Sequence, residues 1–225
     1  LATVAILIGG IIQIVPTIMV KSNIPTIASV QPYTPLELEG RDLYIREGCV
    51  GCHSQMVRPF RSEVKRYGEY SKSGEYVYDH PFLWGSKRTG PDLHRVGQKY
   101  NDNWHFNHMW DPQSTSSGSV MPGYKWMYAN EAMDHEHIEK KMEVMVTLGV
   151  PYTKEDIANA RKNMDAQSAQ IEKNLSGDPD FVKSYEASKK AAAARGEEFV
   201  PMKDREIVAL IAYLQRLGTD TQVKK

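Results

Sequence analysis

The chain is poor in cysteine and has no excess of either charge. Only Cys49 and Cys52 occur among 225 residues, so the sequence offers no disulfide framework. The 28 basic and 28 acidic side chains give a formal net charge of +0. We therefore expect no nucleic-acid partner, and any charge-guided docking must depend on local patches. The length suits one globular domain with appendages.

Charged residues are also absent from the first twenty positions, LATVAILIGGIIQIVPTIMV. At a rise of about 1.5 Å per residue, a helix of this length just crosses a hydrocarbon core of roughly 30 Å. We predict a transmembrane anchor at residues 1–22, and the start inside an apolar run suggests that the natural N-terminus precedes it. Gln13 and the pair Gly9 and Gly10 favour a helix that packs against a partner. The alternative is a secretory signal peptide, whose apolar stretch is usually shorter.

The run Cys49-Val50-Gly51-Cys52-His53 is typical of covalent haem attachment. The two thiols form thioethers with the haem, and the adjacent histidine is the proximal iron ligand. A zinc half-site would need further ligands at fitting spacing, and the chain has no second cysteine pair. A thioredoxin-like dithiol would follow a strand in an alternating β/α pattern, which this sequence lacks. We therefore predict one covalent haem c.

Two further segments are predicted to form helices at the two ends of the haem domain. Thr34-Pro35-Leu36-Glu37 has the pattern of a capping box with proline at the first helical position. Near the C-terminus, Asp204 is predicted to cap DREIVALIAYLQRLG, which carries an apolar stripe and ends at Gly218. Class I cytochromes c cross an N-terminal and a C-terminal helix, and Gly40 with Tyr213 resembles that contact.

The second axial ligand is either a methionine or a second histidine, and the chain has ten methionines and seven histidines. We favour Met121, in the run SSGSVMPGY, because it resembles the methionine loop of class I cytochromes c. Met109, Met127 and the cluster from Trp104-His105 to His108 remain alternatives. Met56 lies too close to His53 in the chain to reach the opposite face of the haem.

Longer runs resemble one particular family. GRDLYIREGCVGCHSQMVRPFRSEVKRYGEYSKSGEYVYDHPFLWGSKRTGPDL, continued by WHFNHMWDPQSTSSGSVMPGY, is similar to the mono-haem c-type subunit of cbb3-type cytochrome c oxidases. The resemblance implies an electron-transfer subunit without its own catalytic centre. It would pass electrons from a di-haem subunit or a soluble donor to the b-type haem of the haem–copper subunit, which reduces oxygen and pumps protons. It also implies a single-pass protein of the bacterial inner membrane with its haem domain on the periplasmic side.

Individual residues also have expected roles. In class I cytochromes c a matching proline carbonyl accepts the second N–H of the proximal imidazole, and by this resemblance Pro91 is the candidate, although a simple turn would contain the same dipeptide. Arg58, in a local basic stretch, would pair with a haem propionate or dock on the catalytic subunit, although a solvated helix face would show the same charges. The resemblance to the oxidase subunit implies that the loop containing Ser86 faces the catalytic subunit near a calcium ion.

We thus predict an all-α fold, a class I cytochrome c domain with one N-terminal transmembrane helix and a helical insert before the last helix. The domains are an anchor at 1–22, a linker at 23–33, the cytochrome domain at 34–130 and 201–219, an insert at 131–200 and a tail at 220–225. In the insert, Thr153 opens a capping box and Gly177-Asp178-Pro179 separates two helices, which we interpret as a solvated hairpin, with a docking surface as the alternative. The alternative functions are a free-standing membrane-anchored carrier and a haem sensor or peroxidase.

Overall fold

The computed structural model describes residues 1–20, 25–128 and 133–221, and all its regular elements in these ranges are helices. The all-α prediction is confirmed. The predicted boundaries at residues 22–23 and 130–131, and the end of the tail at 222–225, lie outside the described residues.

In chain order the elements are α1 (Ala2–Met19), α2 (Pro35–Arg46), η2 (Cys49–Gly51), α3 (Arg61–Tyr67), η3 (Ser73–Tyr76), α4 (Asp102–Trp110), α5 (Pro112–Thr115), η4 (Lys125–Tyr128), α6 (Ile138–Thr147), α7 (Lys154–Ala158), α8 (Ala160–Leu175), α9 (Pro179–Arg195), η5 (Met202–Asp204), α10 (Glu206–Arg216) and η6 (Thr219–Thr221).

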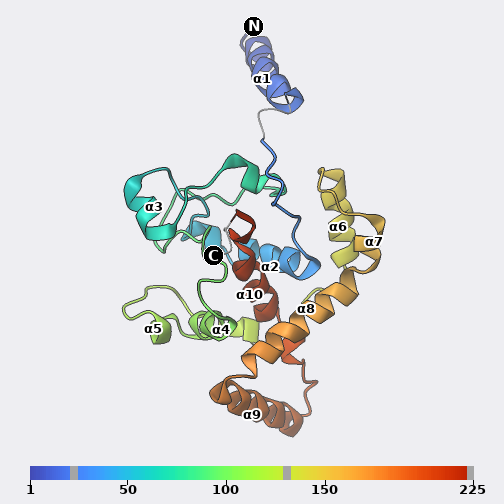
Figure 1. Ribbon diagram of the computed structural model, residues 1–225. Coiled ribbons are helices and arrows are strands. Elements are labelled where there is room, and N and C mark those ends of the chain that lie inside the picture. Colours follow the sequence, from blue (N-terminus) through green and yellow to red (C-terminus); the bar gives the residue numbers. More distant parts are fainter. Residues whose placement is uncertain (21–24, 129–132, 222–225) are drawn as a thin grey trace.

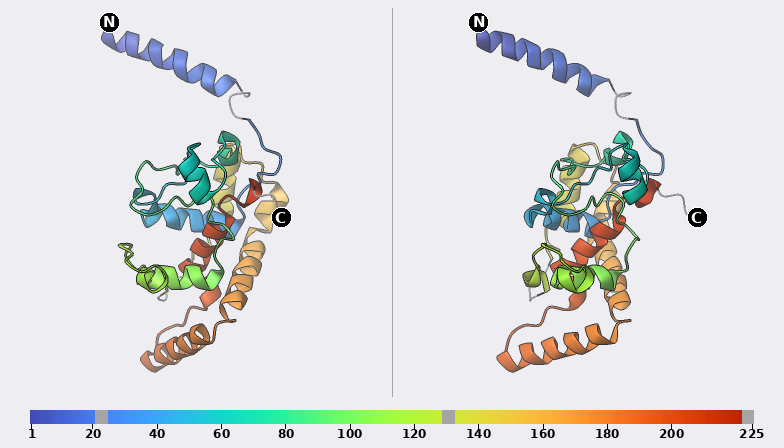
Figure 2. Two further views of the ribbon diagram at one scale, coloured as in Figure 1. Left: turned by 60° about the vertical axis from the view of Figure 1, so that its left-hand side comes forward. Right: turned by 90° about the vertical axis from the view of Figure 1, so that its left-hand side faces the viewer.

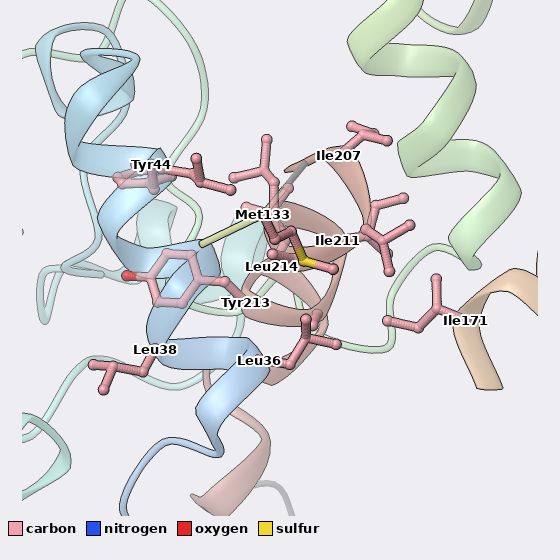
Figure 3. Close-up of a cluster of buried hydrophobic side chains, with 14 of the residues drawn as sticks. Leu36, Leu38, Tyr44, Met133, Ile171, Ile207, Ile211, Tyr213 and Leu214 are labelled. Carbon is pink, nitrogen blue, oxygen red and sulfur yellow. The ribbon is translucent and has the colours of Figure 1, made fainter. Parts of the chain in front are cut away.

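The crossing of α2 with α10 forms the centre of the molecule (Figure 1). Gly40 permits the close approach, because a Cβ atom there would lie 1.9 Å from the carbonyl oxygen of Ala209 and 2.8 Å from Cβ of Tyr213. The predicted contact between Gly40 and Tyr213 is therefore confirmed. One turn further along α2, the ring of Tyr44 lies 5.4 Å from that of Tyr213, and both are buried in the apolar cluster of Figure 3.

The ends of these helices follow their sequences, with one exception. Thr34 and Glu37 form the predicted capping box, and Pro35 is the first helical residue of α2. The prediction that Asp204 caps the last helix is wrong: Asp204 ends the short helix η5, and Arg205 occupies the N-cap position of α10 without a side-chain capping bond. Its guanidinium instead bonds to the carbonyl oxygens of Val200 and Tyr128, which ties the start of α10 to the preceding loop.

The insert is helical, as predicted, but it is not a solvated hairpin. Helix α8 packs on α2, and the Oγ1 of Thr34 donates a hydrogen bond of 2.7 Å to the side chain of Gln167. The buried residues of the insert join the same apolar cluster as α2 and α10, and they include Met142, Met145, Met164, Ile171 and Leu175. Among the described helices of the insert, α9 extends away from this body (Figure 2). The insert therefore enlarges the core of the cytochrome domain.

Helix α1 lies apart from the other helices (Figures 1 and 2). Its apolar side chains are exposed, with Ile6 at 74% and Ile12 at 65% of their full accessibility. Within the described residues, no helix combines the length and the apolar character that crossing a membrane requires. The predicted transmembrane helix is therefore not confirmed by the structure.

Candidate functional site

The CVGCH segment forms a tight turn directly after α2. Gly48 adopts a left-handed conformation with φ of 72°, which ends the helix and turns the chain into η2. The carbonyl oxygen of Cys49 then accepts hydrogen bonds from the backbone N–H groups of Cys52 (3.1 Å) and His53 (2.9 Å). Both cysteines are free thiols, Cys49 buried and Cys52 exposed. The turn thus holds two unpaired thiols and an imidazole within one helical turn.

The imidazole of His53 is oriented by a segment 38 residues later in the chain. Its Nδ1 lies 2.8 Å from the carbonyl oxygen of Pro91, which is the contact that the resemblance to class I cytochromes c implied. A carbonyl oxygen can only accept, so Nδ1 carries the proton and Nε2 is left with a free lone pair. Gly90 packs flat against the ring, since a Cβ atom there would lie 2.3 Å from Cε1 of His53. The ring is therefore fixed in both tautomer and position.

Burial and charge act in opposite directions on the pKa of His53. Burial lowers the pKa of His53, while the hydrogen bond to Pro91 and the charge of Asp92 partly offset this effect. A neutral imidazole is the form that binds a metal ion. Burial also raises the pKa of the Cys49 thiol.

The loop containing Met121 packs against the end of α4. The backbone N–H of Tyr124 donates a 2.8 Å hydrogen bond to the carbonyl oxygen of Met109, and Gly123 leaves no room for a side chain beside Trp110. Met121 itself is half-buried against the apolar core. The loop is thereby held on a helix, but its ligation of iron stays a prediction.

The alternative ligands lie on α4 and η4. Met109 and Met127 are both buried in the apolar cluster. The Nδ1 of His108 is 2.6 Å from the Oγ1 of Thr115, and its pKa is lowered by burial and then by the charge of His53, so the two imidazoles are electrostatic neighbours. The ring of His105 is 1% exposed, and neither of its nitrogens has a hydrogen-bond partner in the described part of the chain.

These residues fit a haem. The two free thiols and the unpaired Nε2 of His53 are the groups that a covalent haem would use. The structure also leaves buried polar atoms unpartnered within its described ranges, among them Nε1 of Trp84 and both ring nitrogens of His105. Buried polar groups of native proteins are normally hydrogen-bonded, so the N–H of Trp84 and the single N–H of a neutral His105 are suited to an acceptor such as a haem propionate.

The other predicted site residues are Arg58 and Ser86, and their contacts in the structure define no role for them. Arg58 is half-exposed, and its guanidinium pairs with the carboxylate of Glu63. Ser86 is exposed on the loop that follows Trp84. Across the residues that the structure describes, no group of three or more His, Cys, Asp or Glu side chains could hold a metal ion. Neither the propionate contact of Arg58 nor the calcium contact of Ser86 is tested by this geometry.

Sequence reasoning missed the buried polar residues behind His53. Asp92 accepts hydrogen bonds from Ser54 and from the backbone of Met56, and Arg88 lies beside this pair. The runs CHSQM and GSKRTGPDL contain all of these residues, and the only available signal was that both belong to the longer runs by which the chain resembles the mono-haem oxidase subunit. Nothing in either run showed that the two segments lie side by side.

The crossing of α2 with α10, the CVGCH turn and the oriented imidazole together define a mono-haem cytochrome c. The family model described as "Cytochrome C oxidase, mono-heme subunit/FixO" matches residues 1–221, so the chain belongs to this family of cbb3 oxidase subunits. It is accordingly a membrane-associated subunit of an oxidoreductase complex with partner subunits. No curated protein was found to match the chain.

Proposed function

We propose that this chain is the electron-transfer subunit of a cbb3-type terminal oxidase. It would receive electrons from a di-haem subunit or a soluble donor and deliver them to the b-type haem of the haem–copper subunit, which reduces oxygen to water. The observation that carries the proposal is the CVGCH turn, in which Pro91 fixes His53 with Nε2 available to iron. The catalytic centre for oxygen belongs to the partner subunit.

When bound, haem c supplies reversible one-electron chemistry at its iron. Cys49 and Cys52 would hold it by thioethers, and Nε2 of His53 would be the proximal ligand. The hydrogen bond from Nδ1 to Pro91 strengthens the donation of that ligand and prevents ring rotation. Met121 would be the second residue to bind the iron, and its loop is held against α4.

The proposed location is the bacterial inner membrane, with α1 as a single-pass anchor and the haem domain on the periplasmic side. The support is the exposed apolar surface of α1, since such patches mark contacts with membranes or with protein partners. The loop at residues 85–87 is proposed to face the catalytic subunit, where the exposed hydroxyl of Ser86 would contact an interfacial calcium ion. Arg58 is proposed to contact a haem propionate or the same subunit.

The decisive measurement is the haem content of the purified complex. Membranes are solubilised in mild detergent, the tagged chain is isolated, and a pyridine haemochrome spectrum is recorded. We expect b-type haem in fixed ratio with c-type haem, together with oxygen uptake. A single c-type haem per chain without b-type haem would instead identify a free-standing membrane-anchored carrier.

The axial ligand is tested by Met121→Ala, with Met109→Leu as the matched control on the neighbouring helix. We expect Met121→Ala to lose the normal low-spin spectrum and to lower the reduction potential, because methionine ligation raises it. Met109→Leu should leave both unchanged. An unaltered spectrum in Met121→Ala would remove Met121 from the iron.

A further inference from the structure

A carboxylate with no role in the site described so far lies directly behind the haem-binding turn. Asp92 follows Pro91, and its side chain is fully buried. Its Oδ2 accepts hydrogen bonds from Oγ of Ser54 (2.7 Å) and from the backbone N–H of Met56 (2.8 Å), while Oδ1 accepts from the N–H of His94 (2.9 Å). One carboxylate therefore joins the segment after His53 to the segment after Pro91.

Backbone hydrogen bonds join the same two segments on either side of this carboxylate. The N–H of Gly90 donates to the carbonyl oxygen of Cys52 at 2.9 Å, and the N–H of Leu93 donates to that of Ser54 at 2.8 Å. The contact between His53 and Pro91 lies between these two bonds. Because Asp92 binds three groups at once, it fixes the register that places the Pro91 carbonyl on the imidazole.

The guanidinium of Arg88 and the carboxylate of Asp92 both form hydrogen bonds with the hydroxyl of Ser54. Nε of Arg88 donates to Oγ of Ser54 at 2.7 Å, and the same hydroxyl donates to Asp92. Arg88 also lies 3.5 Å from Asp92 and pairs with Glu63 at 2.6 Å. Its side chain is 19% exposed, whereas that of Asp92 is 0% exposed. Solvent therefore screens the positive charge more than the negative one.

The negative charge of Asp92 lies close to His53. Asp92 directly follows Pro91, whose carbonyl oxygen is 2.8 Å from Nδ1 of His53, and its Oδ2 is 2.7 Å from Oγ of Ser54, the residue after His53. An oxidised haem iron carries one more positive charge than a reduced one. A fixed negative charge next to the proximal ligand therefore favours the oxidised form by Coulombic attraction.

We propose that Asp92 is a positioning and potential-setting residue for the haem ligand His53, and that Arg88 opposes its charge. The carboxylate holds the Pro91 carbonyl in place and lowers the reduction potential of the haem, while the guanidinium raises it. This inference rests on the proposed function, because it requires that His53 binds the haem iron.

The test is a spectroelectrochemical titration of the c-type haem in the full chain, purified with its haem attached. Asp92→Asn keeps the shape of the side chain and removes its charge. We expect a more positive midpoint potential, with the reduction equilibrium changed by about tenfold, which is ~59 mV for one electron. Arg88→Gln is expected to shift the potential in the negative direction.

Two further variants separate charge from packing. Ser54→Ala removes the shared hydroxyl and keeps both charges, so its shift should be smaller than either of the others. Arg88→Lys keeps the charge and should restore most of the change seen in Arg88→Gln, which also tests the proposal if Asp92→Asn does not fold. Shifts of one sign in Asp92→Asn and Arg88→Gln would indicate a structural role alone and overturn the proposal, as would an unmoved potential in Asp92→Asn.

The result is distinguishable from a failure of the proposed function. If the unmodified chain carries no covalent haem, or no b-type haem accompanies it, the proposed function fails before any variant is compared. If the haem content is as proposed and the potentials do not separate by sign, only the role assigned to Asp92 and Arg88 fails.

Discussion

The region around the haem-binding turn, residues 49–94, and the insert from α6 to α9 are built in opposite ways. The first has only short helices, and several charged or polar side chains are buried in it, including Ser54, Glu63, Asp79, Asp92 and His94. The insert contains the two long helices α8 and α9, and Ser168 is the one buried polar side chain found in its described residues. Polar contacts shape the first region, whereas apolar packing shapes the second.

The difference between the two regions shows where side chains must be held in precise positions. A buried polar network specifies one arrangement, because each unsatisfied member costs free energy. Such a network surrounds His53, the residue whose orientation matters for a haem ligand. In the insert, ion pairs such as that between Arg161 and Glu139 are exposed and contribute little. We therefore expect substitutions near the turn to alter haem properties, and substitutions in the insert to alter stability alone.

The largest expected effect is a displacement of the imidazole of His53. In Gly90→Ala, the new Cβ would lie 2.3 Å from Cε1 of His53 and displace a ring whose Nδ1 is bonded to the carbonyl oxygen of Pro91. We expect the normal low-spin haem spectrum to be lost while the thioether bonds still form. Haem staining after denaturing electrophoresis and an absorption spectrum measure these two properties separately.

Gly51→Ala is the matched control for that substitution. Gly51 lies inside the CVGCH run, but a Cβ atom there would meet nothing within 4 Å. Its spectrum should remain that of the unmodified chain. If both variants lost the low-spin spectrum equally, the close contact between Gly90 and His53 would not be the cause.

The second expected effect is on stability. In Gly40→Ala, the added Cβ would overlap the carbonyl oxygen of Ala209 and push α2 away from α10. Overpacking of this kind costs about 1–3 kcal/mol, and contact with rigid backbone places this site at or above the upper end of that range. The measurement is the free energy of unfolding from urea denaturation.

A glycine of the insert gives the comparison. In Gly177→Ala, the added Cβ would lie 3.3 Å from the carbonyl oxygen of Asn174, so a shift of a few tenths of an ångström accommodates it. We expect a much smaller loss of stability than in Gly40→Ala. Equal losses would show that the crossing of α2 with α10 is no tighter than the turn before α9.

The same difference explains how much could be predicted from the sequence. Local patterns located the insert helices, because the capping box at Thr153 and the break at Gly177-Asp178-Pro179 involve residues close in the chain. They failed at Asp204, where the same kind of pattern was interpreted as a cap although the helix begins later. The packing of α8 on α2 was missed, since nothing in a single helix shows which neighbour covers it.

In the candidate site, one feature could be predicted from the sequence alone and other contacts could not. The CVGCH run predicts its own chemistry, because the spacing of two thiols and an imidazole is contained in five residues. The contact of His53 with Pro91 was expected only through resemblance to class I cytochromes c. The bond between Ser54 and Asp92 joins residues 38 positions apart, and no periodicity or composition indicates such a pair.

A third prediction concerns the acid sensitivity of the polar region. Burial lowers the pKa of His94 to about 3, whereas an unfolded histidine titrates near 6.5. Between these values the unfolded chain binds a proton that the folded chain does not, so stability falls as the pH is lowered. From pH 7.5 to pH 5 this costs about 2 kcal/mol.

His94→Gln isolates this contribution, because glutamine does not titrate. We expect the unmodified chain to lose about 2 kcal/mol more than the variant between the two pH values. Urea denaturation at pH 7.5 and pH 5 provides the comparison. Parallel losses in the two proteins would mean that His94 is protonated in the folded state as readily as in the unfolded one.

The smallest expected effect compares one local motif in the central helix α2 and in the insert. Thr34 caps α2 and Thr153 caps α7, each within a capping box. Thr153→Ala should cost about 1 kcal/mol, the usual value for a lost cap. Thr34→Ala should cost more, because the Oγ1 of Thr34 also donates a 2.7 Å hydrogen bond to Gln167 of α8. Equal losses of unfolding free energy would show that this bond adds nothing to the docking of the insert, which would then depend on apolar packing alone.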